Sequence, residues 1–138
     1  MRPPGGTVLP GDPTYAHPRS SVYPFLAGLF GLAHAATYNW NGGTADWDTS
    51  TANWNGAGTI WPGSGTDNDA VFGGSVGTIT LTTGVAANDI TFNTTGYLLQ
   101  GNTLTLNGGA TPVLSAGTGI DATISSIIAG SLGLTKVG

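Results

Sequence analysis

Four tryptophans with polar neighbours form the most chemically suggestive group in this sequence. They stand seven residues apart, at Trp40, Trp47, Trp54 and Trp61. An indole ring offers a flat apolar face to a sugar ring, and nearby amides or carboxylates can bind sugar hydroxyls. The pattern therefore raises the hypothesis of a sugar-stacking platform, with hydrogen bonds from Asn39, Asn41, Asp46 and Asn53.

A structural role for the same tryptophans is the interpretation we favour. A spacing of seven is also the period of a coiled coil, but the intervening Asn, Gly, Asp and Thr residues are poor helix formers. On strands and turns, wide rings would instead cover the apolar atoms at an open end of a β-rich core. We expect such a cap and keep the sugar platform as the alternative.

Two aspartates lie in a glycine-rich turn that resembles a calcium-binding loop. Asp67 and Asp69 follow Gly63-Ser64-Gly65-Thr66, and carboxylates with backbone carbonyls are the hard oxygen ligands that Ca²⁺ prefers. Calcium turns of this kind occur in tandem arrays, whereas this one occurs once. We therefore favour a structural turn, keep calcium as a weak alternative, and expect no cofactor.

Catalysis is the least favoured kind of chemistry here. The only histidines, His17 and His34, precede residue 36, in a segment that we expect to be removed. Serines without a histidine lack the usual general base. Aspartates two residues apart on one turn, such as Asp46 and Asp48, are poorly placed to flank a glycosidic bond. A polysaccharide-acting enzyme is thus the least favoured interpretation, and we expect no enzyme.

The charge composition excludes several classes of partner. Charged residues make up 7% of the chain, against the usual quarter. After residue 35 there are six aspartates, and Lys136 is the only cationic residue. With so little positive charge to neutralise phosphates, nucleic-acid binding is excluded, as is charge-driven binding of anionic lipid or acidic polysaccharide. The absence of cysteine excludes disulfides and thiolate chemistry.

An apolar segment followed by small residues predicts export. Residues 22–32 are largely apolar, too short to cross a bilayer, and end on Ala33-His34-Ala35. This is the pattern of a signal peptide with its cleavage site. We expect residues 1–35 to be a leader and signal peptide, with cleavage between Ala35 and Ala36, and the protein to be extracellular or on the cell surface.

The residues expected to remain divide into a Trp/Gly/Asn-rich N-terminal cap, 36–75, and a strand-rich part, 76–138. Apolar side chains alternate with threonine in Ile79-Thr80-Leu81, and equally in residues 90–92 and 104–106. Nothing shows helical periodicity, so the fold should be all-β. The expected strands are Thr78–Thr82, Asn88–Asn93, Tyr97–Gln100, Thr103–Asn107, Val113–Ser115 and Ala122–Ile128.

The spacing of these strands favours a β-solenoid. Ile79, Leu104 and Ile124 begin comparable strands at similar intervals along the chain, and each interval has the length typical of one solenoid coil. A β-sandwich or jelly roll also uses short strands and stays as the alternative. In a solenoid, the last coil around Ile124, Ile127, Ile128 and Leu132 would be uncovered, so we expect end-to-end self-association.

An ordered set of residues spans the whole of 36–138. It comprises Trp40-Asn41-Gly42-Gly43, Trp47, Asn53-Trp54, Pro62, Asp67-x-Asp69-Ala70-Val71-Phe72, Ile79-x-Leu81, Ile90-x-Phe92, Tyr97-x-Leu99, Leu104-x-Leu106 and Gly133-Leu134-x-Lys136-x-Gly138. Together these resemble the start of bacterial proteins with autotransporter-associated β-strand repeats.

This resemblance implies a fold and a role. In that family an exported passenger forms a long right-handed parallel β-helix, often followed by an outer-membrane or other surface anchor. The chain would then be an N-terminal part of such a passenger, held at the membrane only through a C-terminal anchor that these residues lack. We expect structural display or adhesion, with surface glycans or other cell-surface proteins as partners. A carbohydrate-binding β-module that uses the Trp cluster is the alternative.

Overall fold

The computed structural model describes residues 36–138 except residue 57 and residues 64–66. The predicted leader and signal peptide, with Ala33 and Ala35, lies outside the described residues, and Ala36 is the first residue of the first strand. The described residues form strands and turns without an α-helix. Accordingly, no helix in this part of the chain is long and apolar enough to cross a membrane.

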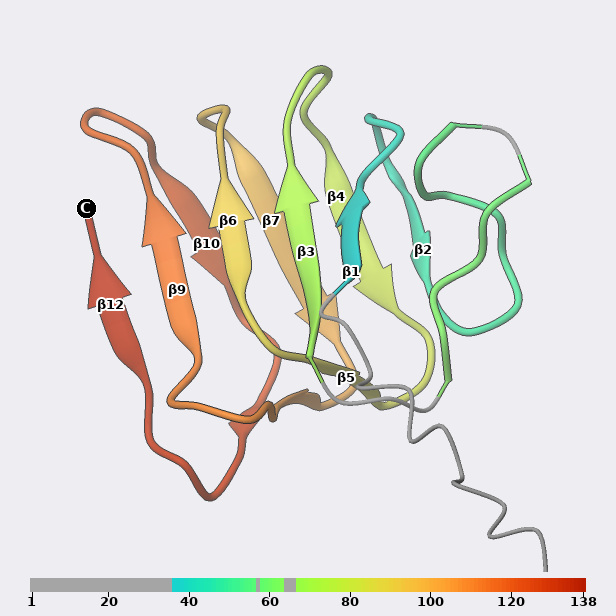
Figure 1. The fold of residues 1–138 in the computed structure, drawn as a ribbon. Helices are drawn as coiled ribbons and strands as arrows, with labels where there is room; N and C mark the ends of the chain where they lie inside the picture. Colours follow the sequence, from blue (N-terminus) through green and yellow to red (C-terminus); the bar gives the residue numbers. More distant parts are fainter. Residues whose placement is uncertain (1–35, 57, 64–66) are drawn as a thin grey trace, which may run out of the picture. The chain divides into compact units, whose positions relative to one another are not determined.

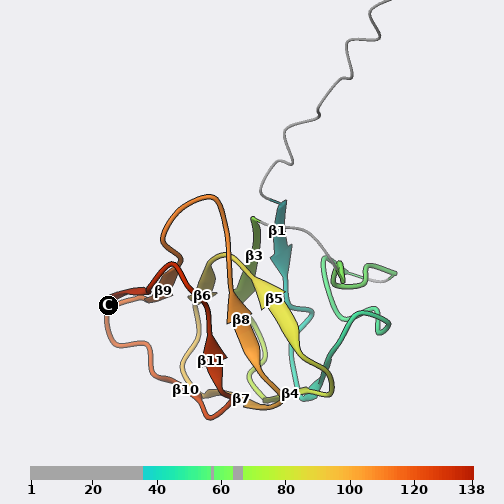
Figure 2. The same cartoon turned by 90° about the horizontal axis from the view of Figure 1, so that it is seen from below.

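The strands form three sheets, and every strand pair in them is parallel. Figure 1 shows the first two sheets, and Figure 2 shows the third. The first sheet contains β1 (Ala36–Asn39), β3 (Asn68–Phe72), β6 (Ile90–Phe92), β9 (Val113–Ala116) and β12 (Thr135–Val137). The second contains β2 (Ala45–Trp47), β4 (Thr78–Leu81), β7 (Tyr97–Gly101) and β10 (Ala122–Ile124). The third contains β5 (Val85–Ala87), β8 (Leu104–Leu106) and β11 (Ile128–Ala129).

Strands that follow each other in sequence lie in different sheets, so the chain winds as a solenoid. β3, β4 and β5 form one coil, and β6, β7 and β8 form the next, with each strand paired to its equivalent one coil away. A β-sandwich would pair antiparallel strands instead. The predicted all-β parallel solenoid is therefore confirmed, and the sandwich alternative is wrong.

The strand registers correct the predicted set of equivalent residues in successive coils. Ile79 pairs with Leu99, and Leu99 pairs with Ile124, so these three residues occupy equivalent positions in successive coils. Leu104 was expected in this set but lies in the third sheet, opposite Val85. The prediction was wrong because each coil carries three strands, so the interval from Ile79 to Leu104 covers one coil plus one side.

Alternation of side chains builds the core between the sheets. Inward residues such as Ile79, Ile90 and Leu99 are fully buried, while the threonines between them are only partly covered. Burying such a side chain contributes about 1.5–3 kcal/mol. Phe72 and Phe92 occupy paired positions in adjacent coils, and their rings stack with centroids 5.2 Å apart. Contacts between equivalent residues of adjacent coils therefore hold the coils together.

Turns at the corners separate the three sides of each coil. Gly101 ends β7 with φ +99°, and a Cβ there would lie 2.5 Å from the carbonyl oxygen of Leu81 in the preceding coil. Only glycine fits at this close approach. The predicted strand over 122–128 is divided by a corner around Ser126 into β10 and β11. The short strand β5, rich in alanine, was not predicted as a separate strand.

Candidate functional site

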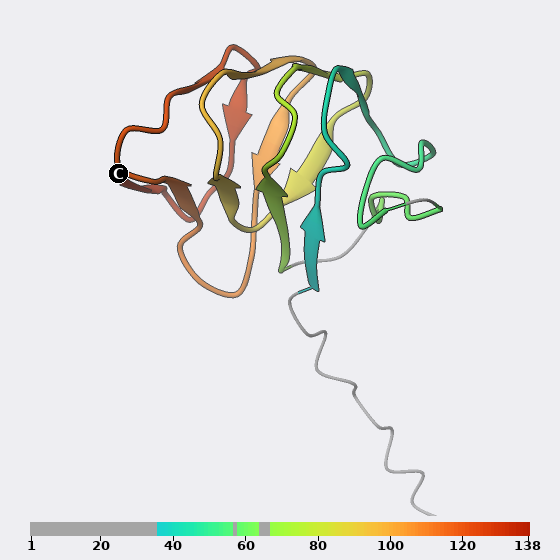
Figure 3. The same ribbon diagram turned by 90° about the horizontal axis from the view of Figure 1, so that it is seen from above.

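The connection between β2 and β3 forms a cap at one end of the solenoid. The first coil contributes β1 and β2, but the third sheet begins only with β5. Residues 48–63 without residue 57, hereafter the cap segment, lie beside this coil on the side away from the C-terminus (Figures 1 and 3). The cap segment thus stands where a preceding coil would otherwise cover the core.

Backbone groups of the cap segment pair with the outer edge of β1. Asn55 N donates to the Asn39 carbonyl at 2.7 Å, and Asn41 N donates to the Asn53 carbonyl at 3.0 Å. The Asn53 side-chain amide also donates to the Asp46 carbonyl of β2 at 2.7 Å. An unpaired sheet edge is a template for pairing with another chain, and these bonds occupy the C-terminal part of this edge.

A tryptophan side chain connects the cap segment to the third sheet. Trp61 Nε1 donates to the carbonyl of Ala86 in β5 at 3.0 Å. The cap segment therefore makes hydrogen bonds to one strand of each of the three sheets. By contrast, the indole nitrogens of Trp47 and Trp54 are buried and find no hydrogen-bond partner among the described residues.

The structure brings the four tryptophans together. Trp47, Trp54 and Trp61 are 0% exposed and Trp40 is 5% exposed. Ring centroids lie 4.7 Å apart for Trp54 and Trp61 and 5.1 Å apart for Trp40 and Trp54, mostly in edge-to-face contact. The rings pack on one another and on Phe72. A sugar ring finds no open indole face here, so this geometry fits the cap and does not support the sugar platform.

Three of the four polar neighbours proposed for sugar hydroxyls join the cap segment to the first coil instead, through their side-chain amides. The Asn41 side chain accepts from Gly56 N at 2.7 Å and donates to the Gly56 carbonyl at 3.1 Å. The Asn39 amide donates to the Asn55 side-chain oxygen at 3.3 Å. These amides, like that of Asn53, hold the cap segment against the first coil.

Asp48 stabilises the start of the cap segment. Its carboxylate accepts hydrogen bonds from the backbone N–H groups of Ser50 and Thr51, at 2.7 and 2.6 Å, and from both hydroxyls. Burial raises the pKa of Asp48, but these hydrogen bonds outweigh it and lower the pKa from 3.8 to about 2. The sequence did not distinguish this aspartate from the others.

Asp67 and Asp69 tie neighbouring coils together. Asp67 accepts from Gly109 N at 2.5 Å, while Asp69 accepts from the Asn88 side chain at 2.9 Å and from Asp89 N at 3.1 Å. The described residues include no group of three or more side chains able to hold a metal ion. These contacts give both carboxylates a structural role, and nothing in them points to calcium.

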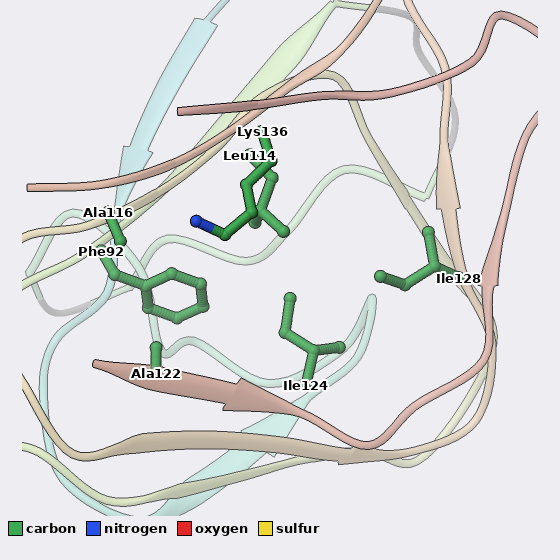
Figure 4. Close-up of a pocket in the computed structure, with 7 residues that line it drawn as sticks. All are labelled: Phe92, Leu114, Ala116, Ala122, Ile124, Ile128 and Lys136. Atoms are coloured by element: carbon green, nitrogen blue, oxygen red, sulfur yellow. The ribbon is translucent and has the colours of Figure 1, made fainter. Parts of the chain in front are cut away.

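The opposite end of the solenoid leaves core side chains uncovered. Two hollows, of about 250 and 240 Å³, open there, and Ile128 lines both. Ile124 lines the larger hollow (Figure 4), as predicted for an uncovered last coil. Ile127 lines neither and is 70% exposed. Lys136 also lines the larger hollow, a position that the sequence analysis missed, although Lys136 follows Leu114 by one coil of the chain.

The fold and its two ends define a parallel β-solenoid with an aromatic cap on its first coil. In sequence, the chain is similar to the adhesin BmaC autotransporter of Brucella suis biovar 1 (strain 1330), with 52% identity over 69 residues. The match covers 50% of this chain and 2% of the length of that adhesin. No protein-family model and no solved structure matches the chain. The match to BmaC confirms the predicted resemblance to an autotransporter passenger.

Proposed function

We propose that residues 36–138 belong to an exported autotransporter passenger that is displayed on the cell surface and takes part in adhesion. The similarity to an autotransporter adhesin carries this proposal, and the parallel solenoid is the fold expected of such a passenger. In the full-length protein the passenger would be associated with the outer membrane through an anchor. The proposed partners are surface glycans or cell-surface proteins.

The outer faces of the sheets suit this role. Several outward positions carry uncharged groups in register, such as Thr80 beside Gln100 and Thr91 beside Ser115. Residues 36–138 contain six aspartates but a single cationic residue, Lys136, which lines the larger hollow. Recognition on these faces would use hydrogen bonds and shape rather than attraction of anions.

The similarity to an adhesin also supports a non-enzymatic role. The alternative carbohydrate-binding module depended on the Trp cluster, and the burial of that cluster offers it no support. If glycans are bound, the outer faces of the sheets are the better candidates.

Export is tested by mass spectrometry of secreted material. We expect the N-terminus at Ala36, because the small residues Ala33 and Ala35 follow the apolar segment. Recovery of secreted protein that begins at Met1 would contradict the export signal.

Adhesion is tested by binding of labelled residues 36–138 to cultured cells and to a glycan array. One double variant, Thr80→Lys with Gln100→Lys, changes the second sheet, and a matched one, Thr91→Lys with Ser115→Lys, changes the first. We expect saturable binding that one pair weakens by about tenfold and the other leaves unchanged. Binding no stronger than that of an unrelated acidic β-solenoid would contradict an adhesive role for these residues.

A further inference from the structure

Three asparagine–glycine pairs lie in the described part of the chain, at Asn41-Gly42, Asn55-Gly56 and Asn107-Gly108. This dipeptide can modify itself, because glycine has no side chain to obstruct attack by its backbone nitrogen on the side-chain carbonyl carbon of the preceding asparagine. The new N–C bond closes a succinimide ring, and the Nδ2 group leaves as ammonia with the proton of the attacking N–H. Water then opens the ring to aspartate or isoaspartate.

Hydrogen bonds decide how easily this deamidation occurs in a folded chain. The asparagine side chain must turn toward the next backbone nitrogen, and that nitrogen must leave any acceptor that it already has. Asn41 and Asn55 are both exposed, so water reaches them. Their hydrogen bonds therefore set the rate of reaction.

One hydrogen bond restrains both of these asparagines. Gly56 N donates to Asn41 Oδ1 at 2.7 Å, so it occupies the nitrogen that would attack Asn55 and also the carboxamide of Asn41. Asn41 Nδ2 donates to the carbonyls of Gly56 and Ala52 at 3.1 and 3.4 Å. Asn55 Oδ1 accepts from Asn39 N at 2.8 Å. Neither side chain can turn without breaking hydrogen bonds.

The third pair lacks this restraint. Asn107 N donates to the Ala87 carbonyl at 2.8 Å, but Asn107 Oδ1 finds no hydrogen-bond partner among the described residues. The backbone of Asn107 is thus held by the neighbouring coil, while its side-chain oxygen is not. This pair serves as an internal reference for the two pairs of the cap.

Deamidation has different consequences at the two cap positions. Asn41 uses its N–H groups as donors, and a carboxylate has none. The carbonyls of Gly56 and Ala52 would then face a negative charge instead of a donor. Asn55 contributes only its oxygen, in bonds from Asn39 N and Nδ2, and a carboxylate oxygen accepts the same bonds. The change therefore weakens the cap at Asn41 and is tolerated at Asn55.

We propose that Asn41 and Asn55 are deamidation sites coupled through Gly56. The intact bond between Gly56 and Asn41 protects both, and modification of Asn41 loosens the cap segment and opens Asn55 to the same reaction. The modification consumes only water, so loosening of the cap depends on the time since folding and not on a partner. The inference goes beyond the proposed function, and failure of the adhesion experiments would leave it standing.

Deamidation rates of folded and unfolded protein test the protection. Residues 36–138 form their strands and core from their own residues, and peptide mass spectrometry follows each pair during incubation at mildly alkaline pH. In concentrated urea the three pairs should react at similar rates. We expect folding to slow Asn41 and Asn55 at least about tenfold more than Asn107, as for one lost hydrogen bond. Protection of Asn107 as large as theirs would overturn the proposal.

Two alanine variants test the coupling. Asn41→Ala removes the acceptor of Gly56 N, and we expect Asn55 to deamidate at least about tenfold faster than in wild type. Asn53→Ala is the matched control, because it removes another side-chain hydrogen bond of the cap segment, to the Asp46 carbonyl, and leaves the Gly56 bond in place. Equal rates at Asn55 in the two variants would overturn the coupling, since general loosening of the cap segment would then explain them.

Two aspartate variants test the consequence of the modification. Asn41→Asp and Asn55→Asp each add one negative charge to the same part of the cap segment, so they differ in the hydrogen bonds that are lost. We expect Asn41→Asp to lower the melting temperature of residues 36–138 and Asn55→Asp to leave it close to that of wild type. An equal or larger decrease for Asn55→Asp would overturn the assignment of Asn41 as the position that releases the cap segment.

Discussion

The two ends of the solenoid are built from the same kind of strand but differ in how their edges are treated. At the first coil, the cap segment makes hydrogen bonds to a strand of each sheet and covers the core with tryptophan rings. At the last coil, β10 and β11 are the outermost strands of their sheets and core residues line open hollows. The repeat thus sets the fold, and the cap segment covers the core at the first coil.

The devices at the two ends also differ chemically. The cap segment pairs part of the edge at the capped end with backbone groups, a side-chain amide and an indole N–H. In the last coil described, the Lys136 ammonium lies among apolar side chains.

Removing the centre of the cap should have the largest effect. Trp54 contacts Trp40, Trp47, Trp61 and Phe72, so Trp54→Ala leaves a large cavity that its neighbours cannot fill. We expect a loss of about 3–5 kcal/mol in the free energy of unfolding, measured by urea denaturation of residues 36–138. A loss below about 1 kcal/mol would show that the cap segment does not stabilise the first coil.

An isoleucine-to-alanine substitution should cost more unfolding free energy near the cap than in the last coil. Ile79 is fully buried between coils near the cap, whereas Ile128 is partly exposed at the open end. We expect Ile79→Ala to cost about 2–4 kcal/mol and Ile128→Ala about 1 kcal/mol. Urea denaturation of both variants provides the measurement, and equal losses would mean that the last coil is as well covered as the inner ones.

Two tryptophan-to-phenylalanine changes isolate one cap hydrogen bond. Trp61→Phe removes the donor to the Ala86 carbonyl, whereas Trp54→Phe removes an indole N–H that has no partner among the described residues. The loss of volume is the same in both. We expect Trp61→Phe to cost about 1–2 kcal/mol more than Trp54→Phe, the usual effect of a broken buried hydrogen bond. The reverse order in thermal denaturation would contradict the assigned bond.

Asp48 should give the smallest effect, with a distinctive pH dependence. Asp48→Ala removes the acceptor for Ser50 and Thr51, and we expect a loss of about 1 kcal/mol near neutral pH for this partly exposed group. Because folding lowers the pKa from 3.8 to about 2, the stabilisation is complete above about pH 4 and is lost as the pH falls through about 2. The melting temperatures of wild type and variant should therefore converge in this acidic range. A constant difference down to pH 2 would contradict the role of the carboxylate.

Local alternation was sufficient to predict the central strands, but it did not predict every strand or how the strands stack. The pattern Ile79-Thr80-Leu81 identified β4, and the same alternation identified β6 and β8. The assignment of Leu104 to the column of Ile79 failed because successive coils differ in length: the step from Ile79 to Leu99 is shorter than the step from Leu99 to Ile124. The number of residues in the corners sets that variation, and local alternation does not show where each corner begins and ends.

The candidate site was only partly predictable for a related reason. A Trp-rich segment is consistent with both a cap and a sugar platform, because ring composition does not determine which faces are covered. Burial of Trp47, Trp54 and Trp61 separates the two. Lys136 points inward because it is in register with Leu114. The sequence around residue 136 does not reveal this register.

Amide hydrogen exchange of residues 36–138, resolved coil by coil, tests most directly whether the cap segment protects the first coil while the last coil is left uncovered. If one end is closed by the cap segment and the other is uncovered, amides of β1 and β2 should exchange about as slowly as those of β6 and β7. Amides of β10, β11 and β12 should exchange fastest, because their coils open at little cost. Slow exchange throughout β10–β12 together with rapid exchange of β1 and β2 would show that the cap segment does not protect the first coil.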